Sequence, residues 1–85
     1  MEQLKPHITA IANQYNHSYE LVHEMVVNTI EMNTAFQNDD YDVFGITFPK
    51  FKAYAEQYGE TGLISAISDM LSKEYYTRYP VNKKQ

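Results

Sequence analysis

Apolar residues recur at steps of three and four along most of the chain, which is the period of amphipathic helices. The first such stretch predicts a helix that opens at Pro6, because proline suits the first helical turn. Its apolar face comprises Leu4, Ile8, Ile11 and Tyr15. Asn16 and His17 then predict a turn, since asparagine tolerates the left-handed backbone conformation.

A second helix is predicted from Tyr19 to about Gln37, with Ser18 as its N-cap. Glu20 would lie in the first turn, where the positive end of the helix dipole favours a carboxylate. About half of the helical circumference is apolar, which suits a helix that contacts more than one neighbour.

The sequence NDDYD, from Asn38 to Asp42, interrupts this periodicity and predicts a loop. We expect an acidic loop over residues 38–47, with a short extended piece from Val43 to Phe48. A third helix would begin after Thr47 or Phe48, with Pro49 in its first turn. Gly59 would end that helix in the left-handed conformation.

A fourth helix is expected after Thr61, as its cap, and would stop near Arg78 because Pro80 cannot continue it. The two halves of the chain then resemble each other, since residues 5–21 align without gaps with residues 48–64. The identical pairs are Pro6/Pro49, Ala10/Ala53, Ala12/Ala55, Gln14/Gln57 and Tyr15/Tyr58. Either one unit is duplicated, or two helical hairpins share the residues that start and stop helices.

These elements predict an all-α fold, a four-helix domain built from two similar helix-turn-helix hairpins. A single helical domain would cover residues 1–80, with hairpin one at 5–37, the acidic loop at 38–47 and hairpin two at 48–79. Residues 81–85 would form a flexible basic tail.

The chain of 85 residues contains no cysteine, which excludes disulfides, thiolate metal sites and thiol nucleophiles. Neither a secretory signal nor an apolar run of membrane-spanning length is found, so we expect a cytoplasmic protein without a membrane partner. The abundance of Asn, Gln, Tyr and Lys suggests a bacterial, phage or mobile-element origin.

The distribution of charge says more than the net charge of −4. Lysine and arginine are absent between Pro6 and Pro49, whereas the second predicted helix carries carboxylates at Glu20, Glu24 and Glu31 on one stripe. This stripe is either the solvated face of an amphipathic helix or a docking surface for a basic partner. The predicted partner-binding residues are Glu20, Glu24, Val27, Glu31, Asp39, Asp40, Tyr41 and Asp42.

Val27 is the apolar residue within this stripe, and with Tyr41 and Phe44 it could centre an interface with a partner or with a second copy of the chain. A homodimer is therefore a further candidate.

The residues Ala12, Asn16 and Val22 have the spacing of a small residue, a turn residue and a locking apolar residue. With this spacing, the stretch from Ile8 to Val27 resembles the helix-turn-helix class. The resemblance implies that the second helix reads DNA. That helix opens with Glu20 and Glu24 and carries no lysine or arginine, so phosphates would repel it. We therefore do not expect nucleic acid as the main partner.

A different nucleic-acid surface is available at the end of the chain, where tyrosines alternate with cations. The alternative nucleic-acid-binding residues are Lys73, Tyr76, Arg78, Lys83 and Lys84. The same residues also suit a helix C-terminus and a solubilising tail.

No motif points to catalysis, a cofactor or a metal. Glu20 and His23 form one carboxylate–histidine step, but the aligned positions of the second half hold no ligand. The segment that begins at Asp40 resembles a calcium loop only in part, because Phe51 takes the position of the bidentate glutamate. The sequence thus favours a non-catalytic protein-binding or regulatory module, and the alternative is a helix-turn-helix-type regulator that binds nucleic acid through its second hairpin and tail.

Overall fold

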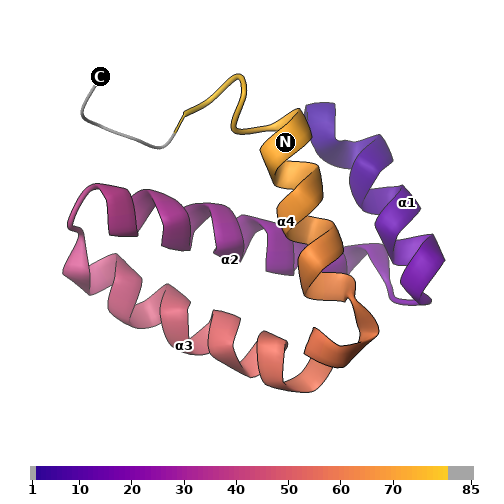
Figure 1. Cartoon of the computed structure of the whole chain (residues 1–85), viewed down its shortest axis with the longest axis horizontal. Helices are drawn as coiled ribbons and strands as arrows, with labels where there is room; N and C mark the ends of the chain where they lie inside the picture. The colour runs from indigo at the N-terminus through magenta and orange to yellow at the C-terminus, as the bar shows by residue number, and fades with distance from the viewer. Residues whose placement is uncertain (1, 81–85) are drawn as a thin grey trace.

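Four α-helices pack together in the part of the chain that the structure, a computed structural model, describes (residues 2–80; Figure 1). They are α1 (Lys5–Tyr15), α2 (Tyr19–Gln37), α3 (Tyr41–Tyr58) and α4 (Leu63–Glu74). Short 3-10 turns precede α1 (η1, Glu2–Leu4) and α4 (η2, Gly59–Thr61), and no strand occurs over this range. The all-α prediction is confirmed.

The connection between α1 and α2 has the predicted local structure. Asn16 adopts the left-handed conformation, with φ of 61°, and the His17 N–H donates to the Ala12 carbonyl over 2.9 Å. The Ser18 hydroxyl accepts from the Leu21 N–H over 3.1 Å, which makes Ser18 the N-cap of α2. Helix α2 has the bounds that its apolar periodicity predicts.

The predicted acidic loop at residues 38–47 is wrong from Tyr41 onward. Only residues 38–40 form the turn, in which Asp39 has φ of 56° and the Asp40 N–H donates to the Ala35 carbonyl over 2.9 Å. The Asp40 carboxylate then accepts from the Val43 N–H over 3.2 Å. The acidic cluster therefore caps the next helix, because aspartate satisfies free N–H groups at a helix start.

The predicted extended piece from Val43 to Phe48 is also wrong, since α3 runs through it and carries Pro49 in its interior. Proline has no N–H, so the carbonyl of Gly45, four residues before it, lacks its usual helical donor. Contacts with α2 offset this loss: Thr47 is buried, and its carbonyl accepts from the Asn28 side-chain amide over 3.0 Å. Tertiary packing overrides the local signal that Pro49 gives.

The start of α4 differs from the prediction by a few residues. Gly59 is right-handed, with φ of −60°, and the left-handed glycine is Gly62, with φ of 89°. Gly62 holds the cap position, while the Thr61 hydroxyl accepts from the Leu63 N–H over 3.2 Å. Helix α4 ends at Glu74 rather than near residue 78, and residues 75–78 form turns.

Aligned residues of the two halves thus differ in their local structure. Pro6 lies in the first turn of α1 but Pro49 inside α3, and Asn16 is left-handed where Gly59 is right-handed. Their origin as two copies of one unit stays a prediction. The predicted basic tail, residues 81–85, lies outside the described residues.

The buried core occupies one end of the molecule. It is built by η1, α1, the first half of α2 and α4, through Leu4, Ile8, Ile11, Ala12, Val22, Met25, Val26, Leu63, Ile67, Met70 and Leu71. Helix α3 runs beside α2 in the opposite direction, and the turn that joins them lies at the end far from α1 and α4 (Figure 1). Half of the α2–α3 pair therefore extends beyond the core.

Candidate functional site

The second half of α2 and the first half of α3 (residues 30–51, here the distal hairpin) expose an unusual amount of apolar surface. Phe36, Tyr41 and Ile46 are 64%, 78% and 62% exposed. Val43 and Phe48 are 37% and 44% exposed. Among the described residues, Tyr79 is the one other large apolar side chain that is exposed to this extent. Exposed apolar side chains that are gathered in this way mark interaction surfaces more often than single ones do.

One side of the distal hairpin carries an aliphatic groove of about 500 Å³. Ile30, Glu31, Thr34, Ala35, Asn38, Asp40, Val43, Ile46 and Thr47 line it. Val43 and Ile46, from one stripe of α3, give it apolar surface. The carboxylates of Glu31 and Asp40 lie beside that surface, so the groove combines apolar contact with negative charge.

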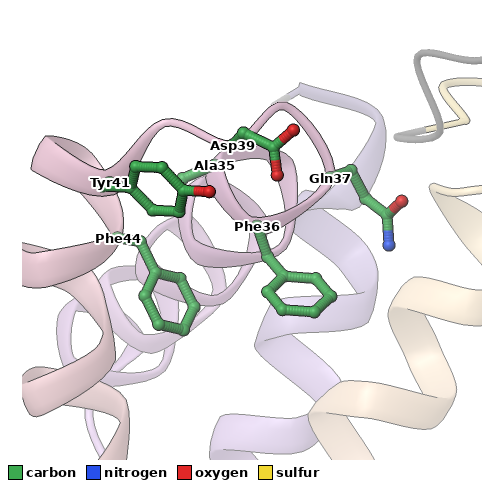
Figure 2. Close-up of a pocket in the computed structure, with 6 residues that line it drawn as sticks. All are labelled: Ala35, Phe36, Gln37, Asp39, Tyr41 and Phe44. Carbon is green, nitrogen blue, oxygen red and sulfur yellow. The ribbon is translucent and has the colours of Figure 1, made fainter.

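The other side carries an aromatic face, formed by Phe36, Tyr41, Phe44 and Phe48. The Phe36 and Phe44 ring centroids are 5.9 Å apart, and those of Phe44 and Phe48 are 5.2 Å apart with nearly parallel planes. A hollow of about 430 Å³ opens beside these rings, lined by Ala35, Phe36, Gln37, Asp39, Tyr41 and Phe44 (Figure 2). Figure 2 shows the rings of Phe36 and Phe44 extending side by side from α2 and α3.

Three of the predicted docking carboxylates have roles in local structure. Glu20 lies in the first turn of α2, Asp42 lies in the first turn of α3, and Asp40 caps α3. Negative charge stabilises a helix at each of these positions. Their presence in the sequence is therefore explained in part by folding, and only Asp40 also lines the aliphatic groove.

The other part of the predicted acidic stripe faces a cation that the sequence does not place there. A hollow of about 270 Å³ between α2 and α3 is lined by His23, Glu24, Val27, Asn28, Glu31, Lys50 and Tyr54. Lys50 thus lies near Glu24 and Glu31, although within residues 2–80 it forms no salt bridge with either. The field of the stripe is reduced by Lys50 but is not neutralised by a direct pair.

Glu24 is exposed on α2 and lies near Tyr54 of α3. Burial raises the pKa of the Tyr54 phenol above its usual value, and the negative charge of Glu24 and a hydrogen bond to it raise that pKa further. Val27 is half-buried between Glu24, Glu31 and Tyr54, and it also borders a small hollow with Ile30 and Tyr75. Of the stripe on α2, Glu31 is the carboxylate that adjoins the aliphatic groove.

The residues of the helix-turn-helix resemblance occupy the expected positions. Ala12 and Val22 are buried between α1 and α2, and Asn16 forms the turn. The start of α2 exposes Glu20 and Glu24, and α2 contains no lysine or arginine to bind phosphate.

The alternative nucleic-acid surface is brought together only in part. Lys73 and Arg78 are exposed, whereas Tyr76 packs on the core and its hydroxyl accepts from the Asn33 side-chain amide over 2.6 Å. Burial raises the pKa of the Tyr76 phenol, although the hydrogen bond with Asn33 acts in the opposite direction. Tyr76 is thus held against α2 rather than presented for base stacking, and Lys83 and Lys84 lie outside the described residues.

The sequence prediction did not include Phe36, Ile46 and Phe48 as site residues. Phe36 lies on the broad apolar arc of α2, Ile46 falls in the predicted acidic loop, and Phe48 falls at the predicted start of the third helix. One signal was available: Phe44, Phe48 and Phe51 follow each other at steps of four and three, as in a helix. That period continues through the segment where Asp, Gly and Pro indicate a break.

Over residues 2–80, no group of three histidine, aspartate or glutamate side chains is placed so that it could hold a metal ion. None of the helices in this range is long and apolar enough to cross a membrane. No family model, curated protein or solved structure matches the chain.

Proposed function

We propose that the chain is a non-catalytic protein-binding module that docks its distal hairpin on a basic partner surface. The observation that carries this proposal is the aliphatic groove, where exposed Val43 and Ile46 lie beside the carboxylates of Glu31 and Asp40. An apolar centre with charge around it is the usual composition of a protein interface. The apolar part supplies affinity, and the charge selects the partner.

The shape of the groove defines the kind of partner. It lies between two antiparallel helices, which suits an amphipathic helix laid along it with apolar residues at steps of three and four. Lysine or arginine beside those apolar residues would pair with Glu31 and Asp40. The net charge of −4 adds a long-range attraction that speeds the encounter with such a partner.

The predicted carboxylates then divide into two groups. Glu31 and Asp40 contact the partner, because they line the groove. Glu20, Glu24, Asp39 and Asp42 contribute to the field around it. Fields of this kind act over about 10 Å at moderate salt, so the second group affects the rate of binding more than the affinity.

The experiment is capture of partners from a native lysate, followed by binding of the identified partner to purified variants. Glu31→Lys and Ile46→Asp should each abolish capture, since they reverse the charge beside the groove and place a charge on its apolar surface. Glu56→Lys is the matched control for Glu31→Lys, because Glu56 is an exposed carboxylate of α3 that does not line the groove. Equal retention by Glu31→Lys and Glu56→Lys would contradict the proposal.

Three further parts of the proposal are supported by the sequence alone. Composition supports an origin in a phage or mobile element and a cytoplasmic location. The alignment of residues 5–21 with residues 48–64 supports two similar helix-turn-helix hairpins. Each part can fail without affecting the groove.

The second candidate is a regulator that binds nucleic acid through the second hairpin and the basic tail. The exposed cations Lys73 and Arg78, just before and just after the end of α4, favour it. The position of Tyr76 against α2 disfavours it, because the Tyr76 ring is then not presented for base stacking.

A further inference from the structure

We infer that the aromatic face joins two copies of this chain into a symmetric dimer, in which the aliphatic groove of each copy stays open to its partner protein. The two surfaces belong to different sides of α3, because Phe44 and Phe48 follow one helical stripe while Val43 and Ile46 follow another. The inference concerns a surface that the proposed function does not use.

Three rings of the aromatic face, those of Phe36, Phe44 and Phe48, form a continuous row. Phe44 stacks on Phe48 at 5.2 Å and contacts Phe36 at 5.9 Å, so α2 and α3 are joined by aromatic contacts at this side. Despite those contacts, Phe36 remains 64% exposed and Phe48 44% exposed. Rings held in place by their neighbours lose little conformational entropy when a partner covers them.

The area of the face is sufficient for a weak dimer. An aromatic side chain covers about 150–250 Å² when buried, so the exposed fractions of Phe36, Tyr41 and Phe48 correspond to roughly 400 Å². A stable interface of standard size buries about 800 Å² on each partner. The three rings supply about half of that share, which predicts association that depends on protein concentration.

The face is also complementary to itself, as a two-fold interface requires. It offers protruding rings, Tyr41 and Phe48, next to a hollow of about 430 Å³. A cavity of about 150 Å³ is enough to hold benzene, so the hollow has room for a ring from the second copy. Around a two-fold axis, each copy would insert a ring and receive one.

Charge disfavours a second copy on the groove more than on this face, where Asp39 lines the hollow and is the one carboxylate among its lining residues. The carboxylates of Glu31 and Asp40 line the groove, where two copies would repel each other. On the aromatic face, Lys52 lies one helical turn beyond Phe48 on the same stripe. The remaining repulsion comes from the net charge of −4 on each copy, so salt should strengthen the dimer by screening it.

Gly45 provides a substitution that tests the interface without removing a ring. It lies between Tyr41 and Phe48 on their stripe, and a side chain added there meets no atom within 4 Å. Gly45→Arg therefore fills open space in the monomer and, since arginine favours helix more than glycine does, leaves the fold intact. In the dimer the same side chain would separate the two aromatic faces.

The test is sedimentation equilibrium of the full chain between about 10 µM and 1 mM, the range expected for a small interface. The mean mass of the unchanged chain should rise from 9.9 kDa toward twice that value, and should rise further at higher salt. Gly45→Arg should stay at the monomer mass throughout. Ala53→Arg, on an exposed position of α3 outside the aromatic face, adds the same charge and should associate as the unchanged chain does.

Two results would overturn the dimer: a constant mass of 9.9 kDa for the unchanged chain over the whole range, or a dimer that Gly45→Arg leaves intact. The test is separate from that of the groove. Glu31→Lys should lose partner capture and keep the dimer, whereas Gly45→Arg should lose the dimer and keep partner capture. Salt separates the two further, because it should weaken capture and strengthen the dimer.

Discussion

Asn28 of α2 donates a hydrogen bond from its side-chain amide to the main-chain carbonyl of Thr47 in α3, over 3.0 Å and between two buried residues. The bond joins positions that are far apart in the sequence, at the level where the distal hairpin leaves the core. Thr47 lies between Gly45, whose carbonyl has lost its helical partner, and Pro49, which causes that loss. Both proposed surfaces are positioned by this link between α2 and α3.

The first prediction concerns the stability that this bond provides. Asn28→Ala leaves the buried Thr47 carbonyl without its side-chain donor, and should lower the free energy of unfolding by about 1–3 kcal/mol. Urea unfolding followed by circular dichroism measures the change. Asn13→Ala, at an exposed position of α1, should stay within about 0.5 kcal/mol of the unchanged chain. Equal effects of the two substitutions would mean that the bond contributes nothing measurable.

The second prediction separates the two roles of Asp40, which caps α3 and carries charge beside the groove. Asp40→Ala should cost about 0.5–2 kcal/mol of stability, because the Val43 N–H loses its acceptor. Asp40→Asn keeps a good cap and should leave stability nearly unchanged. Both should weaken partner binding to the same extent. If Asp40→Asn binds as the unchanged chain does, the charge of Asp40 has no part in docking.

The helices that the sequence predicts correctly are those whose boundary signals are local. Asn16 and Ser18 act within the turn that they belong to, so their residue types alone predict the end of α1 and the start of α2. The same reasoning from local signals does not predict the start of α3. Asp40, Gly45 and Pro49 all suggest interruption, yet the helix continues because its packing against α2 outweighs their intrinsic cost. That packing depends on a contact between positions distant in sequence, which no local pattern contains.

The same distinction applies to the candidate site. The acidic stripe was visible because Glu20, Glu24 and Glu31 are close in sequence, but Lys50 reaches the same hollow from α3. Exposure of Phe48 and Ile46 could not be predicted either, since it follows from where the core ends along the α2–α3 pair. Side-chain types indicated that apolar residues were present, and only the packing shows that they remain uncovered.

The third prediction concerns Pro49. Pro49→Ala restores a donor for the Gly45 carbonyl and removes a ring that crowds it, so the free energy of unfolding should rise by about 1–3 kcal/mol. Thermal unfolding measures the gain as a higher midpoint temperature. A loss of stability would show instead that the local geometry imposed by proline is needed to bring Thr47 to Asn28. The double variant Pro49→Ala, Asn28→Ala distinguishes the two cases. Asn28→Ala already removes the bond to Thr47, so any loss of stability that Pro49→Ala causes through that bond should disappear.

The fourth prediction concerns alkaline pH. The pKa values of the Tyr54 and Tyr76 phenols are raised in the folded chain, so folding favours their protonated forms. Their contribution to stability is complete below the unfolded pKa of about 10 and is lost as pH rises through the range above it. Tyr76→Phe should lower stability at neutral pH by about 1 kcal/mol, through the lost bond to Asn33, and should make the alkaline decline shallower. Parallel pH curves for the two chains would contradict the assignment to Tyr76.

The last prediction separates protein binding from nucleic-acid binding. In an electrophoretic assay at low salt, the full chain should not bind duplex DNA. The first turns of α2 present the carboxylates of Glu20 and Glu24, and α2 contains no lysine or arginine. A charge-reversed chain, with Glu20→Lys and Glu24→Lys, keeps the α1–α2 scaffold and should gain binding that weakens steeply as salt rises. The reversal thus tests whether charge alone excludes DNA from this hairpin. Retardation of DNA by the unchanged chain, lost again in a variant with Lys73→Glu and Arg78→Glu, would instead assign binding to the end of α4 and remove the basis for docking through the groove.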